Sequence, residues 1–283
     1  MKSYLKNHAY AVLPGFYGSM PNGTIKTFSR GGSDITGSIV ARAVSATVYE
    51  NWTDVSGFLM ADPRCIDNPK VIDTITYKEL RELSYMGATV LHEDAIFPVR
   101  YSKIPINIRN TNRPEDRGTF IVPQSDDVND TVITGIAGKV GFSTITIEKD
   151  MMNAELGFGR RVLQAIEENG ISFEHFPSGI DTMSVVVSTK ELHNKRADVV
   201  SAIVKAVDPD NIFVEENLAL IAVEGRGMVK AKGTAARVFD ALAKAGVNIR
   251  MIDQGSCELN IIVGVDSNDY MTALQAIYNE FVK

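Results

Sequence analysis

The sequence GRRVLQAIEENGISF at residues 159–173 returns as AARVFDALAKAGVNI at residues 235–249. The two stretches align without a gap, and Arg, Val, Ala and Gly recur at equivalent places, so that residue 235 corresponds to residue 159. A repeat of this length that occurs twice is typical of tandem domains and not of a solenoid.

Each copy has apolar residues at helical spacing, then a glycine that ends the helix, then a β-rich run. Further strands are predicted at residues 183–188 and 258–263, each followed by another helix. This order predicts a duplicated βαββαβ unit of ferredoxin-like type. We expect the two domains to cover residues 132–207 and 208–283.

The chain before the repeats mixes strand and helix patterns up to about residue 123. This order favours an α/β layered domain with a largely parallel sheet. Residues 124–131 are polar and follow a proline, which is typical of a linker. The predicted strands are residues 11–18, 24–28, 46–52 and 105–109, and the predicted helices are residues 37–43 and 77–90.

The composition limits the classes of function. The net charge is -6 and there is no dense basic stripe, which argues against a nucleic-acid partner. No apolar run approaches the ~20 residues that span a bilayer, and the N-terminus is not a signal peptide. Cys65 and Cys257 stand alone, which favours reduced thiols and a cytoplasmic protein. The four histidines have no ligand spacing, so we expect neither a metal site nor a prosthetic group.

The stretch from Phe28 to Thr36, FSRGGSDIT, lies between a predicted strand and a predicted helix. Two glycines allow a tight turn, a helix start favours an anion, and Arg30 adds a planar positive charge. The stretch is neither a Walker loop nor a GxGxxG fingerprint. Its spacing alone leaves two interpretations open, an anion site or a plain strand-to-helix turn.

Five stretches resemble, in the same order, segments of aspartokinases. This resemblance extends over essentially the whole chain and identifies it as a member of that family. The stretches are SRGGSD at 29–34, WTDVSG at 52–57 with ADPR at 61–64, YMGATVLH at 85–92, PINIRNT at 105–111 and GVNIRMIDQGS at 246–256.

The resemblance implies part of an amino-acid-kinase (carbamate-kinase-like) domain followed by two ACT domains, which sense amino acids. The family transfers the γ-phosphoryl group of ATP, bound with Mg²⁺, to the side-chain carboxylate of L-aspartate, on the route to lysine, threonine and methionine. By this resemblance Arg30 binds the aspartate carboxylate, and Gly31 and Gly32 offer main-chain amides. Ser33 and Asp34 order the substrate and neighbouring catalytic groups.

The nucleotide positions also come from the resemblance. Two departures put nucleotide contacts in question, since Leu59 stands where relatives often have a tyrosine and Thr89 where they often have a lysine. From the residues alone, Trp52 is expected to pack in the core. The positions implied to bind ATP are Thr53, Asp54, Arg64, Thr89 and Val90.

Aspartokinases carry a Lys-Phe-Gly-Gly loop near their start whose lysine neutralises phosphates, and these 283 residues contain no such motif. We therefore expect this chain alone to be inactive, as a fragment, a truncated gene product or one part of a split enzyme. We also expect an unpaired sheet edge and uncovered apolar surface.

The first repeat keeps the features of an effector pocket of an ACT domain. Amides at a helix start can hold an α-carboxylate, and Glu174 matches an acidic position that faces the effector amine in lysine-inhibited relatives. In the alternative interpretation, Glu174 is an exposed charge on a strand and Met152 packs in the core. Lysine is the expected effector and threonine the alternative. The residues expected at this site are Met152, Glu155, Phe158, Gly159, Phe173, Glu174 and Ser178.

The resemblance further implies a homodimer through the ACT domains, with inhibition by a population shift. Two other functions stay open. One is a non-catalytic regulatory subunit or amino-acid sensor, which the missing lysine loop favours. The other is a different amino-acid kinase, such as one acting on glutamate, against which the tandem ACT repeat argues.

Overall fold

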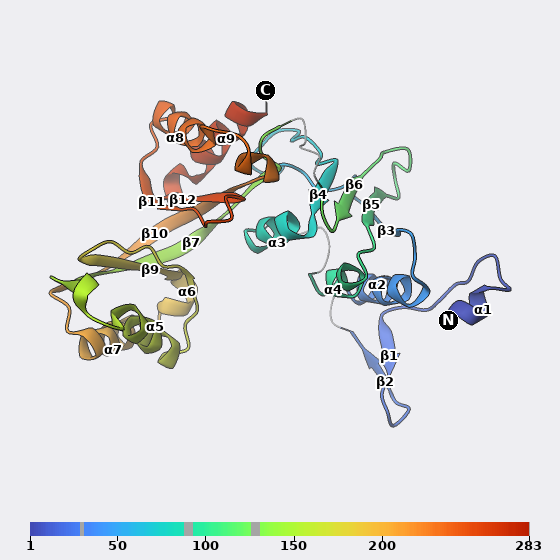
Figure 1. Cartoon of the computed structure of the whole chain (residues 1–283), viewed down its shortest axis with the longest axis horizontal. Helices are drawn as coiled ribbons and strands as arrows, with labels where there is room; N and C mark the ends of the chain where they lie inside the picture. Colours follow the sequence, from blue (N-terminus) through green and yellow to red (C-terminus); the bar gives the residue numbers. More distant parts are fainter. Residues whose placement is uncertain (29–30, 88–92, 126–130, 283) are drawn as a thin grey trace. The chain divides into compact units, whose positions relative to one another are not determined.

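A computed structural model gives the fold, and it describes residues 1–28, 31–87, 93–125 and 131–282. The chain divides into two compact units (Figure 1). The first unit contains residues 1–137 and 223–234 with the C-terminal end of the chain, and the second contains residues 138–222 and 235–280. No helix in the described parts is both long and apolar enough to cross a membrane.

The first unit is built around a four-stranded mixed sheet with the strand order β3-β5-β6-β4. Its strands are β3 (Tyr49–Thr53), β4 (Thr74–Thr76), β5 (Ile106–Asn110) and β6 (Thr119–Val122). The remaining elements before residue 123 are α1 (Lys2–Leu5), the hairpin of β1 (Tyr17–Ser19) and β2 (Ile25–Thr27), α2 (Gly32–Val44), α3 (Tyr77–Tyr85) and α4 (Glu93–Tyr101).

Two of the three strand pairs in this sheet are parallel, as the sequence predicts. β3 pairs with β5 and β4 with β6 in parallel, whereas β5 and β6 are antiparallel. The antiparallel pair arises because residues 111–118 are too few for a crossover connection, which takes about a dozen residues.

One face of this sheet is the core of the first unit. Ile75, Ile106, Ile108 and Ile121 are fully buried and share this face by their strand register. Helix α2 packs here, because a Cβ atom on Gly37 would lie 2.7 Å from the Tyr49 hydroxyl on the same face. Burial of such apolar side chains is the main stabilising term of the unit.

Two sequence expectations for this unit need correction. The strand expected at residues 11–18 is only Tyr17–Ser19, and Val12 is 96% exposed, because no described strand or helix covers the apolar run. The helix expected at residues 77–90 ends at Tyr85, and its expected last residues lie outside the described part of the chain. The linker expected at 124–131 lies largely outside it as well.

The two sequence repeats form a six-stranded sheet with helices (Figure 1). Helices α5 and α8 lie where the repeat predicts them, and β9 and β12 are each followed by a helix. The elements of the first repeat are β7 (Gly135–Glu148), η1 (Met152–Ala154), α5 (Phe158–Glu168), β8 (Phe173–His175), β9 (Thr182–Ser188), α6 (Thr189–Leu192) and α7 (Arg196–Val207). Those of the second are β10 (Asn211–Glu224), η2 (Arg226–Val229), α8 (Thr234–Lys244), β11 (Ile249–Asp253), β12 (Asn260–Asp266), η3 (Ser267–Asp269) and α9 (Tyr270–Phe281).

The long strands β7 and β10 each belong to both repeats. The strand order is β11-β12-β10-β7-β9-β8, and β9 pairs only with residues 142–148 of β7. Near the start of β7, a Cβ atom on Gly138 would lie 2.8 Å from the carbonyl oxygen of Leu220 in the second half of β10. The end of β7 lies beside the start of β10, because the Asp210 amide donates to the Glu148 carbonyl at 2.9 Å.

Each repeat therefore takes its fourth strand from the other repeat's long strand. The first repeat uses the second half of β7, then β8, β9 and the first half of β10. The second uses the second half of β10, then β12, β11 and the first half of β7. This differs from two contiguous βαββαβ units, since the fourth strand of the second repeat precedes the first repeat in the chain.

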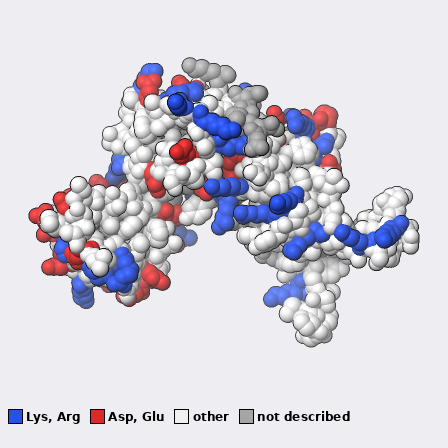
Figure 2. Space-filling model, viewed as in Figure 1, with Lys and Arg blue, Asp and Glu red and all other residues white. Residues whose placement is uncertain are grey.

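The surface carries charges of both signs. Figure 2 shows Asp and Glu side chains and Lys and Arg side chains on the visible face of the molecule. The net charge of the chain is -6.

Candidate functional site

The glycine turn at residues 31 and 32 fixes the start of α2. Gly31 caps the helix with a φ of 82°, a left-handed conformation that favours glycine. A Cβ atom on Gly32 would lie 2.5 Å from the Cβ atom of Phe28 and 3.0 Å from the ring of Phe16. The turn is therefore packed too closely for a side chain, and the first amides of α2 lack intrahelical acceptors.

Asp34 is held in the first turn of α2 by two residues of β3. Asn51 Nδ2 donates to Asp34 Oδ1 at 3.0 Å, and the Tyr49 hydroxyl donates to the Asp34 carbonyl at 3.2 Å. Burial raises the pKa of the Tyr49 hydroxyl above its usual value, so it remains a donor at neutral pH. The network places one fixed negative charge beside the glycine turn, while Ser33 is exposed.

Thr53 and Asp54 lie at the carboxyl end of β3, the end of a parallel strand where α/β proteins bind ligands. Thr53 Oγ1 lies 3.2 Å from Asp54 Oδ1, and Asp54 is exposed. The Thr111 amide donates to the Thr53 carbonyl at 2.8 Å and joins this end of β3 to the end of β5. Hydroxyl and carboxylate oxygens are ligands that Mg²⁺ prefers.

The described residues offer no ready-made metal site. No group of three His, Cys, Asp or Glu side chains in these parts of the chain could hold a metal ion. Mg²⁺ in kinases is commonly held by one or two carboxylates together with substrate phosphates. Asp54 is one such exposed carboxylate.

Arg64 forms an exposed pair with Asp62. The Arg64 Nε and Nη2 atoms donate to the Asp62 carboxylate at 3.0 and 2.6 Å. The hydrogen bond from Arg64 lowers the pKa of Asp62 below its usual value. Leu59 forms a main-chain bridge with Val71.

Trp52 is not in the core, which corrects the expectation from its residue type. The side chain is 45% exposed, and the Arg109 guanidinium lies 4.9 Å from the ring centroid. Trp52 is exposed because its register puts it on the sheet face opposite Ile108, and helix α2 covers the Ile108 face.

Three of the expected site residues lie outside the described part of the chain. They are Arg30, Thr89 and Val90.

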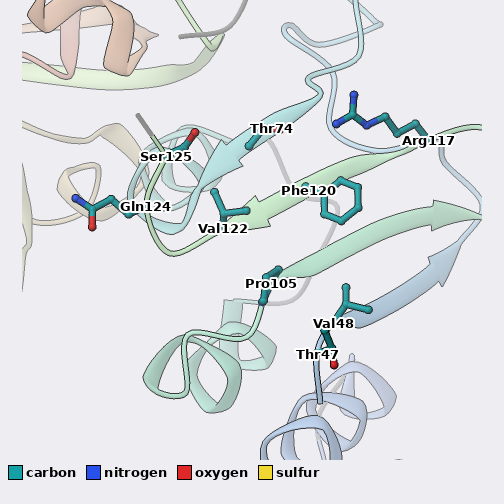
Figure 3. A pocket seen from close by; sticks show the side chains of 9 residues that line it. All are labelled: Thr47, Val48, Thr74, Pro105, Arg117, Phe120, Val122, Gln124 and Ser125. Carbon is teal, nitrogen blue, oxygen red and sulfur yellow. The ribbon is translucent and has the colours of Figure 1, made fainter. Parts of the chain in front are cut away.

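A cavity of about 680 Å³ lies at the other end of this sheet (Figure 3). Val48 and Pro105 line the cavity and directly precede β3 and β5, respectively. Thr53 is the last residue of β3 and therefore lies at the opposite end of that strand. Phe120 and Val122 of β6 complete its apolar wall. The cavity therefore contains none of the described residues expected to bind substrate or nucleotide.

The expected effector loop follows β7 and is tied down by carboxylates. The Asp150 amide donates to Asp210 Oδ2 at 2.7 Å, and the Met151 amide donates to Asp181 Oδ1 at 3.0 Å. Glu155 pairs with Lys149 at 2.8 Å and also with Arg161. The hydrogen bond from Lys149 lowers the pKa of Glu155, so this carboxylate stays charged and engaged within the loop.

The structure brings β8 and the start of α5 together. A Cβ atom on Gly159 would lie 3.3 Å from Met183 and 3.4 Å from the ring of Phe176. The rings of Phe173 and Phe176 lie 6.2 Å apart. Ser178 forms a bridge with Met183, while Glu174 is half-buried on β8. Gly159, Phe173 and Ser178 are thereby grouped around Phe176 and Met183.

Met152 and Phe158 lie in the core of the first repeat. Phe158 is 3% exposed and packs in one cluster with Val162, Ile166 and Met152. Its ring also lies 5.9 Å from the Lys149 ammonium. These two side chains therefore pack in the core and do not line a surface site. The start of α5 can offer a ligand its main-chain amides.

Sequence reasoning missed four residues that position these sites. No local signal marks Asn51, Phe176 or Asp181, since each acts on a residue distant in the chain. Asp210 carries a weak signal, because it follows a proline at the boundary expected between the two repeats, and acidic side chains in turns often bond main-chain amides.

Two protein-family models match the chain. The model of the amino acid kinase family matches residues 1–110, and a model of the ACT domain matches residues 221–281. These matches define the class of protein, one that joins amino-acid-kinase sequence to an ACT domain. The chain is homologous to aspartokinases along almost all of its length, as the following relatives show.

Aspartokinase 3 of Bacillus subtilis is 45% identical over 271 residues, which are 95% of this chain and 60% of that protein. The crystal structure of Clostridium acetobutylicum aspartate kinase is 55% identical with a TM-score of 0.91, covering 99% of this chain and 66% of that one. Escherichia coli aspartokinase III in complex with lysine and aspartate is 28% identical with a TM-score of 0.72, covering 95% and 59%. The chain thus spans 59–66% of the length of these three relatives.

Proposed function

We propose that the chain provides the aspartate-handling and regulatory parts of an aspartate kinase. The observation that carries the proposal is the match to Clostridium acetobutylicum aspartate kinase over 99% of the chain. The glycine turn supports it, because it brings together main-chain amides at the start of α2 and the carboxylate of Asp34. An amino-acid substrate carries both negative and positive charge, and so needs partners of both kinds. The amides suit its carboxylates and Asp34 suits its ammonium group.

In the proposed reaction, an oxygen of the ionised aspartate side chain attacks the γ-phosphorus of ATP. The bond from that phosphorus to the bridging oxygen breaks, and ADP leaves with the electron pair. The nucleophile is already ionised, so catalysis depends on positioning and on neutralising charge. Thr53, Asp54 and Arg64 are proposed for the nucleotide side, and Mg²⁺ would come with the ATP. Arg30, Gly31 and Gly32 are proposed for the aspartate side, with Ser33 and Asp34 ordering the substrate.

A chimera tests this function. It would join the chain to the part of Bacillus subtilis aspartokinase 3 that the chain does not span. We expect it to form aspartyl phosphate, trapped as the hydroxamate, and Asp34→Asn to lower kcat about 100-fold, the usual loss of one charge-positioning group. Thr47→Val, in the cavity at the far end of β3, is the matched control and should leave kcat unchanged.

Full activity of the Asp34→Asn chimera would contradict the role proposed for Asp34. Formation of product from glutamate but not from aspartate would refute the proposed substrate. The 283 residues alone are expected to give no product, since they contain no Lys-Phe-Gly-Gly sequence. Turnover by the chain alone would overturn that part.

We propose L-lysine as the effector, bound at the first repeat between the start of α5 and β8. The amides of Gly159 and Arg160 in the first turn would hold the α-carboxylate, and Glu174 would face the ammonium group of the side chain. The lysine complex of Escherichia coli aspartokinase III supports the choice of lysine over threonine. Inhibition would follow if lysine binds one arrangement of the chain more tightly than another.

Glu174→Gln should weaken lysine binding about 10- to 100-fold, because a hydrogen bond to a charged group is worth about 1.5–3 kcal/mol. Isothermal titration calorimetry measures the dissociation constant. Glu216→Gln is the control, since Glu216 is an equally charged but exposed residue that pairs with Arg196. Equal affinities of wild type and Glu174→Gln would exclude Glu174 as the ammonium partner.

A regulatory subunit or amino-acid sensor is the second candidate, and the match of residues 221–281 to an ACT domain model supports it. The same calorimetry separates the two, because a sensor binds lysine or threonine and ignores ATP. We also propose a homodimer through the ACT repeats, which sedimentation velocity would detect as twice the chain mass.

A further inference from the structure

A single carboxylate ties together three distant segments of the first unit. Glu79 of α3 is 1% exposed, and its side chain accepts hydrogen bonds from each segment. Thr76 donates from its amide at 2.9 Å, Thr134 from its hydroxyl at 2.6 Å, and Arg226 from its amide at 3.0 Å. The Arg226 guanidinium, 12% exposed, also pairs with it at 2.9 Å. We name these residues the Glu79 cluster.

The six-stranded sheet of the two repeats is called the regulatory sheet below. The Glu79 cluster lies where its long strand β7 begins and its long strand β10 ends. Thr134 directly precedes β7, and Arg226 follows β10 after one glycine. The Thr134 amide donates to the Glu224 carbonyl at 2.7 Å. A Cβ atom on Gly225 would lie 2.6 Å from Cα of Ile133, so the two main chains are in close contact.

The first repeat makes the equivalent tie with Asp210, which directly precedes β10 and so lies within the two repeats. By the sequence repeat, Glu148 corresponds to Glu224 and Asp150 to Arg226. There the Asp210 amide donates to the Glu148 carbonyl, and the Asp150 amide donates to the Asp210 carboxylate at 2.7 Å. In each repeat, the main-chain amide two residues after the end of the long strand, β7 or β10, thus donates a hydrogen bond to a carboxylate. In the second repeat that carboxylate is Glu79. This residue belongs to residues 1–110, which match the amino acid kinase family model and are called the kinase segment here.

We propose that the Glu79 cluster is the joint through which the regulatory sheet acts on the kinase segment. Glu79 and Arg226 are positioning residues, because α3 supplies the carboxylate that completes the second repeat. A buried ion pair holds only in good geometry, so a shift of β7 or β10 is passed to α3 or breaks the pair. The inference rests on the proposed function in one respect, since the ligand that moves the sheet is the proposed effector.

Hydrogen–deuterium exchange of the α3 peptide, with and without saturating L-lysine, tests the joint. In the wild type we expect lysine to change exchange in α3 about fivefold or more, the lower end of ordinary allosteric coupling. Arg226→Met should abolish this change in α3 while the lysine dissociation constant stays within about twofold. Arg226→Lys, which keeps the charge, should restore part of it.

Asp210→Ala is the matched control, because it removes the equivalent tie in the first repeat without touching α3. It should loosen the start of β10 and leave the unliganded exchange of α3 unchanged. A lysine effect on α3 that persists in Arg226→Met would overturn the proposal.

A second arm is independent of the effector. The Tyr270 hydroxyl donates to the Gly138 carbonyl of β7 at 3.0 Å, so Tyr270→Phe perturbs this strand directly. We expect faster exchange in α3 in Tyr270→Phe and none of this increase in Tyr270→Phe/Arg226→Met. If calorimetry shows no lysine binding, the effector assignment fails while this arm still decides the joint. An increase in β7 without one in α3 would refute it.

Discussion

Replacing Arg226 by Met will lower the free energy of unfolding of the first unit by about 3–5 kcal/mol, the usual cost of removing one partner of a buried ion pair. The loss is large because Glu79 stays buried and keeps its charge. Methionine preserves most of the side-chain volume, so the change isolates the charge. The single tryptophan, Trp52, lies in this unit, and its fluorescence in a urea titration reports the transition.

The matched control is Arg196→Met, which breaks an exposed pair with Glu216 in the second unit. Such pairs contribute about 0.2–1 kcal/mol, so this variant should unfold almost like the wild type. An Arg226→Met variant within about 1 kcal/mol of the wild type would show that the pair adds nothing net.

The effect of Arg226→Met depends on pH, with a sign fixed by Glu79. Burial by itself raises the pKa of Glu79, but hydrogen bonds from Thr134, Thr76 and Arg226 outweigh burial and hold the pKa below its usual value. In the wild type this carboxylate therefore stabilises the fold above the pKa of the unfolded chain, and the contribution is lost as the pH falls through the folded value. Without Arg226 the pKa rises, so the penalty of Arg226→Met should shrink on acidification.

Replacing Phe158 by Ala will destabilise the regulatory sheet by about 3–5 kcal/mol, the usual cost of truncating a buried phenylalanine. Phe158 is buried with Met152, Val162 and Ile166, directly after the loop that joins β7 to α5. Thermal unfolding followed by far-ultraviolet circular dichroism measures the loss. We expect lysine binding to weaken as well, because the start of α5 loses its support.

Phe158→Leu is the control and should cost less than about 1.5 kcal/mol, since it keeps an apolar side chain in the cluster. If Phe158→Ala instead left the thermal transition unchanged and abolished lysine binding, the side chain would be a ligand contact and not a support.

The sequence predicts local structure well wherever the pattern is periodic. The repeat predicts α5 and α8 almost to the residue, because an amphipathic face and a terminating glycine are both local signals. Residues 11–18 were predicted wrongly, because an apolar run becomes a strand only with a partner. Trp52 was misplaced for a related reason, since the choice of sheet face depends on which side the helices cover.

Non-local ties could not be predicted from one sequence. The capping box of Thr76 and Glu79 is visible as a Thr-x-x-Glu pattern. That the same carboxylate also binds Arg226 is invisible, because the two residues are far apart in the chain. The shared use of β7 and β10 is equally hidden, since strand order in a sheet is decided by tertiary packing. Of the candidate sites, the glycine turn and the effector loop could be located, but not the residues that hold them.

The division of β7 and β10 between the repeats also limits how this half of the protein can be cut, inherited or recombined. A cut at residue 208 would leave the first repeat without a fourth strand, and a start at Phe142 would do the same to the second. Neither repeat is a separable cassette. A recombination event or an engineered swap must exchange residues 135–282 as one piece.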